Sequence, residues 1–455
     1  MIHDNILSLI GNTPLVHIKN IDTGPCELYV KLESQNPGGS IKDRIGLVMI
    51  EAAEREGKIK PGGTIIEATA GNTGLGLALV AAQKGYKLKV VVPDKMSKEK
   101  IGHLRAMGAE VVLTRSDVQK GHPEYYQDLA EKLDAETENS FYINQFANPH
   151  NPNAHENWTA KEIWDQMDHS LDAVVVGVGT SGTLTGLSRF FAREASHVEL
   201  VIADPVGSIL TEYVTTGHLK KAGSWMIEGI GEDFIPPIAD LSRVKSAFSV
   251  SDREAFLAAR ELLEKEGIFG GSSTGALLHA ALTWCRKQTE PKRVVTFCCD
   301  NGNKYLSKMY NNFWMHDQGL MERKQFGDLR DIIGRLHDER ATVTISPDEP
   351  LSTAHKRMIL HEISQLPVLE ENKLVGILDE SDLLLAVVHD PGAFGKPVKD
   401  HMVTDLKWVP TTATIDDLMP MFRKGHVAIV RDEEDRFWGM ITQIDLINYL
   451  RRKYS

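Results

Sequence analysis

A lysine near the N-terminus lies in a sequence context that can make it reactive. Lys42 follows two glycines and Ser40 in the stretch 36–44, and a helix is predicted to begin near Ile41 with Ser40 as its cap. The positive end of a helix dipole, together with partial burial, lowers the pKa of such a lysine. A lysine tuned in this way can form an imine with an aldehyde. The alternative is an exposed surface lysine, and Lys42 alone does not decide between the two.

Two glycine-containing loops follow predicted strands and open predicted helices. The loop 67–76 offers Thr and Asn side chains and backbone N–H groups that suit a carboxylate, or it is only a capped turn. The loop 174–183 contains a GxGxxG pattern, and Asp204 lies at the end of the next predicted strand, a spacing that also fits a dinucleotide-binding dehydrogenase. The loop also carries three hydroxyl groups close together, those of Thr180, Ser181 and Thr183. These favour the binding of a terminal monophosphate over a dinucleotide.

Ser272 opens a further helix after two glycines. It could donate a hydrogen bond to a ring nitrogen or only cap the helix. A reactive lysine, a monophosphate loop, a carboxylate loop and a ring-facing serine are together the parts that hold pyridoxal phosphate and an amino acid.

Residues 1–315 alternate short apolar runs with longer amphipathic stretches. This alternation predicts an α/β fold with doubly wound, mostly parallel sheets, which bind ligands where strands lead into helices. The predicted strands are residues 30–32, 64–67, 89–92, 110–113, 174–177, 200–203 and 294–299, and the predicted helices include 75–84, 98–107, 184–195 and 274–286.

The pattern changes after residue 315. Residues 316–327 are polar and predict a linker, and residues 328–455 contain an internal repeat. The sequence GILDESDLL from Gly376 matches GMITQIDLI from Gly439, and an apolar predicted strand precedes each copy. A repeat of about 60 residues predicts two similar small α/β units packed together.

Composition argues against several classes of protein. The 455 residues carry 51 Lys and Arg against 63 Asp and Glu, a net charge of −12, which does not suit a general nucleic-acid binder. The chain lacks an apolar run of membrane-spanning length and a secretion signal at its start, so we expect a cytoplasmic protein without membrane partners. Four cysteines without metal-ligand spacing predict neither a disulfide framework nor a structural metal.

Several motifs in order resemble the β-family of pyridoxal-phosphate (PLP) enzymes, or fold type II, which includes cysteine synthase and cystathionine β-synthase. The resemblance covers about residues 2–315 and is carried by residues 11–16, 36–44, 71–74, 177–186, 228–231 and 270–272. The tail resembles a pair of CBS modules, a Bateman-type regulatory domain. This combination is typical of the cystathionine β-synthases.

The resemblance implies an activity. It is the condensation of L-serine with L-homocysteine to L-cystathionine and water through an aminoacrylate intermediate, in transsulfuration and cysteine biosynthesis. The alternatives on the same scaffold are a cysteine synthase that uses O-acetylserine and sulfide, and a hydrogen-sulfide-producing enzyme. A nicotinamide dehydrogenase, or a nucleotide sensor with an inert catalytic domain, would have no use for Lys42 and its loops.

The resemblance also implies roles for individual residues. Lys42 would hold the cofactor and move substrate protons, Asn72 would contact the ring oxygen, and Ser272 would face the ring nitrogen. A neutral serine there makes the ring a modest electron sink, which favours β-elimination. The implied phosphate loop comprises Gly179, Thr180, Ser181, Gly182 and Thr183. The implied substrate-binding residues are Thr69, Ala70, Gly71, Thr73, Gln145, Gly229 and Glu232.

Three features depart from relatives. Ala70 replaces a serine that many relatives carry, which removes one possible donor to the substrate. Glu232 stands where animal synthases have Tyr, and we expect it either to meet the ammonium group of the second substrate or to be an exposed loop carboxylate. The first family motif begins at Gly11, so no haem segment is expected.

The tail predicts one nucleotide site. Thr442 and Asp445 match the Thr and Asp with which CBS modules hold an adenosine ribose and phosphate, whereas Asp379 replaces that Thr in the first copy and would repel a phosphate. S-adenosylmethionine or AMP is therefore the expected ligand, unless the pair only sets the assembly. We expect a homodimer or higher homo-oligomer.

Overall fold

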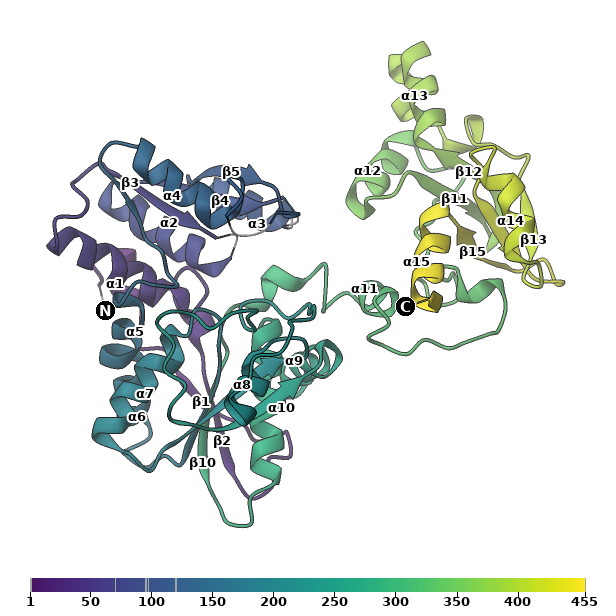
Figure 1. The fold of residues 1–455 in the computed structure, drawn as a ribbon. Helices are drawn as coiled ribbons and strands as arrows, with labels where there is room; N and C mark the ends of the chain where they lie inside the picture. Colours follow the sequence, from purple (N-terminus) through teal and green to yellow (C-terminus); the bar gives the residue numbers. More distant parts are fainter. Residues whose placement is uncertain (1, 70, 95, 97, 119–120, 455) are drawn as a thin grey trace. The chain divides into compact units, whose positions relative to one another are not determined.

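The chain forms two compact units, residues 1–310 and 311–455. A computed structural model describes residues 2–69, 71–94, 96, 98–118 and 121–454. Each unit has its own sheets and its own buried core (Figure 1).

The first unit contains a six-stranded sheet that is parallel except at one edge. The strand order is β1 (Leu15–His17), β2 (Glu27–Lys31), β10 (Arg293–Phe297), β7 (Ala173–Gly177), β8 (Glu199–Pro205) and β9 (Val244–Val250), and only β1 runs antiparallel to its neighbour. The central strand β7 is buried along Ala173–Val176, as expected of a parallel strand covered on both faces. In Figure 1, α7 and α10 flank this sheet on opposite sides.

The same unit contains a four-stranded parallel sheet. Its order is β5 (Glu110–Thr114), β4 (Lys87–Pro93), β3 (Thr64–Ala68) and β6 (Ser140–Tyr142). The helices of the unit are α1 (Lys42–Arg55), α2 (Asn72–Lys84), α3 (Lys98–Ala106), α4 (Tyr126–Glu136), α5 (His150–Ala154), α6 (Ala160–Gln166), α7 (Gly182–Glu194), α8 (Leu210–Thr216), α9 (Asp252–Glu266) and α10 (Ser272–Arg286), with a π-helical turn at His155–Thr159. Strands and helices alternate, which confirms the predicted α/β class.

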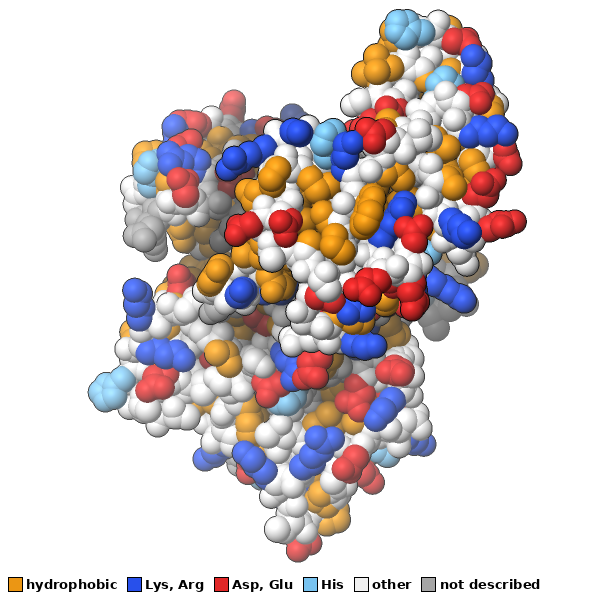
Figure 2. Space-filling model, turned by 90° about the vertical axis from the view of Figure 1, so that its right-hand side faces the viewer, with side chains coloured by type: hydrophobic (Ala, Val, Ile, Leu, Met, Phe, Trp, Pro, Cys, Tyr) orange, Lys and Arg blue, Asp and Glu red, His pale blue; other side chains and the backbone are white. Residues whose placement is uncertain are grey.

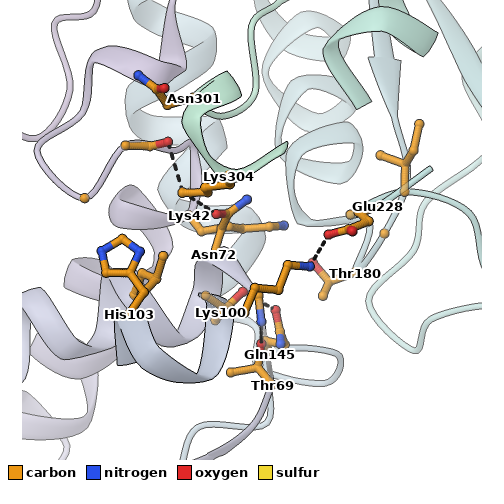
Figure 3. Close-up of a pocket in the computed structure, with 18 of the residues that line it drawn as sticks. Lys42, Thr69, Asn72, Lys100, His103, Gln145, Thr180, Glu228, Asn301 and Lys304 are labelled. Carbon is orange, nitrogen blue, oxygen red and sulfur yellow. Dashed lines mark hydrogen bonds and ion pairs between the residues drawn. The ribbon is translucent and has the colours of Figure 1, made fainter. Parts of the chain in front are cut away.

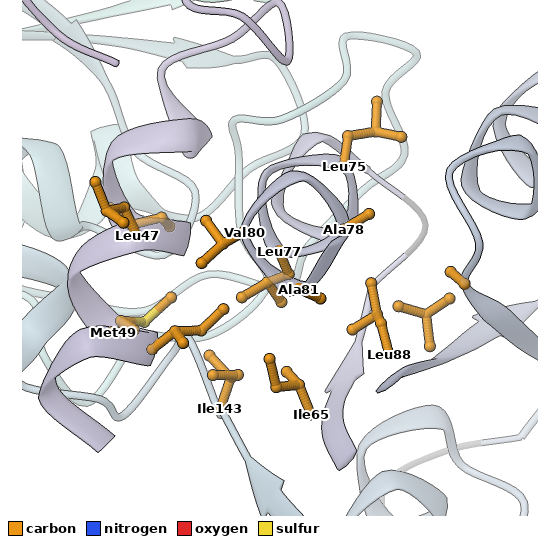
Figure 4. Packing of buried hydrophobic residues seen from close by; sticks show 14 of the residues in the cluster. Leu47, Met49, Ile65, Leu75, Leu77, Ala78, Val80, Ala81, Leu88 and Ile143 are labelled. Carbon is orange, nitrogen blue, oxygen red and sulfur yellow. The ribbon is translucent and has the colours of Figure 1, made fainter. Parts of the chain in front are cut away.

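Helices α1 and α2 pack against each other and against the four-stranded sheet. Figure 4 shows Met49 of α1 and Leu77 and Val80 of α2 above Ile65 of β3, all of them almost fully buried. A Cβ atom at Gly76 would lie only 2.8 Å from the backbone oxygen of Lys42. Glycine therefore allows the close approach that places the loop before α2 beside the start of α1.

The second unit contains two related halves. One half has α12 (Leu351–His361), β11 (Gln365–Glu370), β12 (Lys373–Asp379) and α13 (Glu380–His389), and the other has β13 (Trp408–Pro410), α14 (Ile415–Phe422), β14 (Ala428–Arg431), β15 (Phe437–Ile441) and α15 (Gln443–Tyr454). The repeat glycines Gly376 and Gly439 lie on β12 and β15, and each of these strands leads into the last helix of its half. The unit begins with α11 (Asn312–Asp317). This arrangement confirms the predicted pair of small α/β units.

The first half packs around Leu366 and Leu378. The second packs around Val430 and Ile441 and includes Ile333 from the segment that precedes the first half. The second half therefore contains residues from before and after the first half in the sequence, so the chain joins the two halves at two places.

Every predicted strand of the first unit overlaps an observed strand, although β10 ends at Phe297 and leaves Cys298 and Cys299 in the following loop. The strands β1, β6 and β9 were not predicted. They are edge strands, and their partly exposed residues interrupt the apolar run that a buried parallel strand shows. Among the helices of the described residues, none combines the length and the apolar character needed to span a bilayer.

Candidate functional site

A cavity of about 810 Å³ in the first unit is lined by loops that follow β3, β7 and β10 and by residues 225–232. Lys42, the first residue of α1, lines it (Figure 3). The helix cap is Ile41 rather than the predicted Ser40, because α1 begins at Lys42. Ser40 Oγ still accepts a hydrogen bond from the Lys42 N–H at 3.2 Å, which satisfies one of the free N–H groups at the helix start. Burial lowers the pKa of Lys42, against the opposing effects of Cys299 and Glu232. A less protonated amine is a better nucleophile.

The loop between β7 and α7 turns sharply before the helix. Ser181 has a left-handed backbone, with φ of 71°, which is uncommon for a residue other than glycine and is found at functional loops. Behind this loop, Asn151 Nδ2 donates to Thr180 Oγ1 at 3.0 Å. A Cβ atom at Gly182 would overlap the Asn151 side chain, so glycine is required there.

His155 supports the same loop. Its Nε2 lies 3.3 Å from Thr183 Oγ1, and its Nδ1 lies 3.0 Å from Thr159 Oγ1. Burial keeps the pKa of His155 well below its usual value, so the ring is neutral at neutral pH. The hydroxyl groups of the loop are therefore held by neutral partners, and the backbone N–H groups at the start of α7 supply the positive potential that an anion needs.

The loop between β3 and α2 carries the predicted carboxylate-binding residues. The Thr69 hydroxyl accepts a hydrogen bond from the Gly71 N–H at 3.1 Å, and Thr73 Oγ1 donates to Gln145 Oε1 at 2.7 Å. All four of these residues line the cavity, and Figure 3 places Thr69 and Gln145 together. Ala70 lies outside the described residues.

Asn72 is held from two sides. Its Nδ2 donates to Asp300 Oδ2 at 2.9 Å, and its Oδ1 accepts from Lys304 Nζ at 2.5 Å. Tyr305 also donates its hydroxyl to Asp300 Oδ2, at 2.8 Å. Figure 3 shows Lys42, Asn72 and Lys304 close together. Burial lowers the pKa of Lys304, against the opposing effect of Asp300.

Ser272 is buried at the start of α10, and its hydroxyl accepts a hydrogen bond from the Glu228 N–H at 2.9 Å. The Ser272 side chain also forms a hydrogen bond with Tyr305, so its hydroxyl already contacts two protein groups. The Glu228 carboxylate pairs with Lys100 and, at 2.7 Å, with Lys308. Burial alone would raise the pKa of Glu228, but the two lysines lower it below its usual value.

Glu232 and Gly229 line the same cavity as Lys42. The backbone of Glu232 is fixed by Ser208, whose Oγ accepts from the Glu232 N–H at 3.0 Å. Burial, with a contribution from Asp233, raises the pKa of the Glu232 carboxyl to about 8, and Lys42 opposes this rise. Glu232 is therefore a cavity residue rather than an exposed loop carboxylate.

These residues fit PLP. The amine of Lys42 can react with its aldehyde, and the hydroxyls before α7 and the N–H groups of that helix suit its phosphate. Gly179, Ser181 and Thr183 line a smaller cavity of about 50 Å³ together with Lys42. By contrast, Asp204, the ribose-binding residue expected of a dehydrogenase, is only 1% exposed, and its Oδ2 accepts hydrogen bonds from the N–H and the hydroxyl of Thr211, at 2.8 and 2.9 Å.

A second cavity of about 850 Å³ lies within the second unit. It is lined by Asp445 and by residues from the segment 313–335, including Arg323, Gly334 and Arg335. Thr442 and Asp445 cap α15 through a hydrogen bond of 2.5 Å from the Thr442 hydroxyl to Asp445 Oδ2.

In the first half, the backbone N–H groups of Asp379 and Asp382 donate to each other's carboxylates. Burial and the Asp379 charge raise the pKa of Asp382. Two carboxylates lie at this position, and the expectation that they repel a phosphate stays a prediction.

Sequence reasoning missed the residues that hold the loops from behind, Asn151, His155, Asp300 and Lys304. They come from distant parts of the chain, and neither Asn151 nor His155 belongs to a loop at a strand end. The run that contains Asp300 and Lys304 follows β10 directly. Because ligands bind at the carboxyl ends of parallel strands, that position was the one usable signal.

Comparison with known families matches residues 6–300 to "Pyridoxal-phosphate dependent enzyme" and residues 330–389 and 398–452 to "CBS domain". Similar curated proteins include the cystathionine β-synthases of Dictyostelium discoideum, 35% identical over 99% of this chain and 93% of that protein, and of Mus musculus, 35% identical over 98% and 85%. A cysteine synthase of Staphylococcus aureus is 42% identical over 68% of this chain and 97% of its own length.

Among solved structures, a hydrogen sulfide-producing enzyme from Fusobacterium nucleatum matches 67% of this chain and 100% of its own, with 40% identity and a TM-score of 0.62. An O-ureido-L-serine synthase matches 71% of this chain and 98% of its own, with 33% identity and a TM-score of 0.63. These matches confirm the predicted fold type, the PLP cofactor and a lyase that catalyses β-replacement. The chain belongs to the family of pyridoxal-phosphate dependent enzymes that includes cystathionine β-synthase, in the form that carries a pair of CBS domains.

Proposed function

We propose that this enzyme condenses L-serine with L-homocysteine to give L-cystathionine and water. The observation that carries the proposal is the placement of Glu232 in the cavity of Lys42, where an acidic side chain can receive a second amino acid. Sulfide, the nucleophile of a cysteine synthase, has no ammonium group for such a residue to bind. Cystathionine β-synthases of Dictyostelium discoideum and Mus musculus match almost the whole chain, tail included.

Different residues of the cavity bind the serine carboxylate and transfer protons. The carboxylate of serine binds to the N–H and hydroxyl groups of Thr69, Gly71 and Thr73 and to the Gln145 amide. Bound PLP supplies an aldehyde for the serine amine and a ring that withdraws electrons from its α-carbon. Lys42 Nζ takes the α-proton and later supplies a proton to the departing β-hydroxyl, which leaves as water.

The cofactor-binding assignments are part of the same proposal. Thr180, Ser181 and Thr183, with the N–H groups at Gly179 and Gly182, hold the phosphate. Asn72 contacts the ring oxygen and Ser272 the ring nitrogen. The hydrogen bonds of Asn151, His155 and Asp300 support these groups by fixing their side chains before the cofactor binds.

The visible absorption of the purified protein tests the proposed reaction. We expect a band from bound PLP that L-serine converts to a second band, which L-homocysteine then abolishes while cystathionine forms. If serine has no effect and O-acetylserine produces the second band, the enzyme is a cysteine synthase with a regulatory tail. The 42% identity to a cysteine synthase makes this the second candidate.

Replacement of Glu232 by Ala should raise the KM for homocysteine about tenfold and that for serine less than twofold, because only homocysteine places its ammonium group at this carboxylate. Since the pKa of Glu232 is raised to about 8, the wild-type carboxyl is mostly protonated at pH 7. The KM for homocysteine should therefore fall as the pH rises from 6.5 to 8, and E232Q should lose this fall. Equal changes in both KM values would contradict the assignment.

We also propose that the cavity at Asp445 binds an adenosyl ligand, S-adenosylmethionine or AMP. Burial raises the pKa of Asp445, while the Thr442 hydroxyl and Arg335 lower it. A carboxylate beside a cavity can bind the two hydroxyls of a ribose, and Arg323 and Arg335 supply positive charge for an attached phosphate.

Addition of AMP or S-adenosylmethionine at about 100 times its Kd should raise the melting temperature of the tail by about 5–10 °C and change the catalytic rate. D445N should lose both effects. The matched variant D382N, in the other half, should keep them because Asp382 lies next to Asp379 rather than at this cavity. The absence of any shift with either compound would leave the CBS pair as a structural element.

We further infer a homodimer or higher assembly in the cytoplasm. Ile359, Leu360, Leu384, Leu385 and Val388 of α12 and α13 are 59–76% exposed, which suits a surface covered by another chain. Figure 2 shows apolar side chains among intermingled charged ones on one face of the molecule. The four cysteines are free thiols, as is usual in a reducing compartment. The domain limits at residues 315 and 327 stay a prediction.

A further inference from the structure

Glu67 is a buried acid that the proposed reaction does not use. It lies on β3, where alternate residues share a face, so it points to the same side as Ile65, toward α2. It is 1% exposed, and within the described residues its Oε2 has no hydrogen-bond partner. A carboxyl group buried in this way costs free energy, so its presence calls for an explanation.

Its one side-chain partner leads directly to the substrate cradle. Gln145 Nε2 donates to Glu67 Oε1 at 3.1 Å, and Gln145 Oε1 accepts from Thr73 Oγ1 at 2.7 Å. Gln145 and Thr73 line the cavity, and both are almost fully buried. A primary amide has two N–H groups, so the bond to Glu67 leaves one N–H of Gln145 for a ligand.

The orientation of the Gln145 amide is therefore decided by Glu67. Glu67 Oε1 accepts from the Gln145 nitrogen, and the Thr73 hydroxyl donates to the Gln145 oxygen. With the amide held in this way, its nitrogen, and not its oxygen, is presented to a ligand in the cavity. An amide N–H binds a carboxylate, whereas an amide oxygen would repel it.

We propose that Glu67 is a positioning residue for the α-carboxylate of the amino acid substrate, which it serves by holding the Gln145 amide with its nitrogen toward the cavity. The inference rests on the proposed binding of that carboxylate by Thr69, Gly71, Thr73 and Gln145. It concerns the carboxylate that all candidate amino acid substrates share.

The charge state of Glu67 matters for this role. Burial raises its pKa to about 8, although the amide of Gln145 and nearby backbone N–H groups oppose the rise. Below pH 8 the group is mostly uncharged and does not repel an incoming carboxylate. Above pH 8 it ionises behind the cradle, so substrate affinity should decline.

The groups that surround Glu67 do not titrate in the same range. Val90 faces it in the register with β4, and Thr73 of α2 is uncharged. Tyr142 on β6 is the ionisable neighbour, and burial followed by the Glu67 charge raises its pKa above its usual value. Glu232 titrates elsewhere in the cavity, so the effect of Glu67 is measured as a difference between variants.

The test is an equilibrium titration of the PLP-loaded enzyme with L-serine, followed by cofactor absorbance from pH 7 to 9. E67Q keeps a neutral acceptor for Gln145, so its Kd at pH 7 should stay within twofold of wild type and should no longer rise above pH 8 as steeply. E67L removes the acceptor and should raise the Kd about tenfold at every pH. Y142F should behave as wild type, and circular dichroism at the titration temperature shows which variants are folded.

The proposal is overturned if E67Q weakens binding as much as E67L does, or if E67Q keeps the full wild-type pH dependence. Unchanged affinity in E67L would overturn it as well, while leaving the proposed reaction intact. If the wild-type enzyme responds to O-acetylserine but not to serine, the proposed reaction fails. The same titrations with O-acetylserine then test Glu67, because its α-carboxylate is the same.

Discussion

Replacement of Lys42 by Ala should lower the rate of β-replacement by about 10³-fold or more. The variant loses the amine that reacts with the cofactor aldehyde and, with it, the group that carries the α-proton. A change this large is expected because no other cavity residue can take over both functions from the same position at the first turn of α1.

The same substitution should leave the fold intact. Burial lowers the pKa of Lys42 from its unfolded value of 10.5, so the unfolded chain binds the proton more tightly than the folded chain. This cost to stability begins below pH 10.5 and is complete below the folded pKa, and removal of the amine relieves it. We expect a melting temperature equal to or above that of the apoenzyme at pH 7. Cofactor should also separate from K42A, but not from wild type, during gel filtration.

Lys58 lies three residues after the end of the same helix, is about half exposed and pairs with Glu56, and it provides the control. K58A should keep both rate and cofactor. A K42A rate within tenfold of wild type would remove Lys42 from the proposed mechanism.

The largest effect on stability is expected at Arg44. Its guanidinium is fully buried and donates to Glu33 at 2.7 and 2.8 Å and to Glu162 at 2.8 Å. Lys31, also fully buried, shares Glu162 at 2.8 Å. Two cations and two carboxylates therefore balance inside the first unit, and Arg44 belongs to the first turn of the helix that begins with Lys42.

Replacement of Arg44 by Met leaves Glu33 and part of Glu162 uncompensated in the core. Breaking such a network costs about 3–5 kcal/mol, which lowers the melting temperature of the unit by about 10 °C. Arg115 forms an equally short pair with Asp117 at the surface, and R115M should not shift the melting temperature measurably. Equal shifts in the two variants would show that the buried network does not stabilise this unit.

The network also determines how stability depends on acid. Burial alone would raise the pKa of Glu162, but Arg44 and Lys31 lower it to about 2. Its contribution to stability is therefore complete above its unfolded value of about 4.5 and is lost as the pH falls from there toward 2. R44M should lose less further stability than wild type over this range, as measured by thermal unfolding at each pH.

The sequence by itself determined the fold class and many of the residues that line the cavity. The buried strands of parallel sheets appear as continuous apolar runs, so β3, β4, β7, β8 and β10 were predictable, and the 63-residue repeat revealed the two halves of the tail. Lys42, Thr69, Asn72 and Thr180 were predictable because each lies in a loop at the start of a helix, where sequence signals are local.

The tertiary structure decided which side chains meet those groups. Glu67 lies six residues before Thr73, yet they are linked through Gln145, and Asn151 of α5 and His155 of the following π-helical turn contact the loop at the start of α7. The sequence left open whether Glu232 was exposed, and folding placed it beside Lys42. Contacts between distant segments depend on how the sheets and helices pack, and neither periodicity nor local capping patterns carry that information.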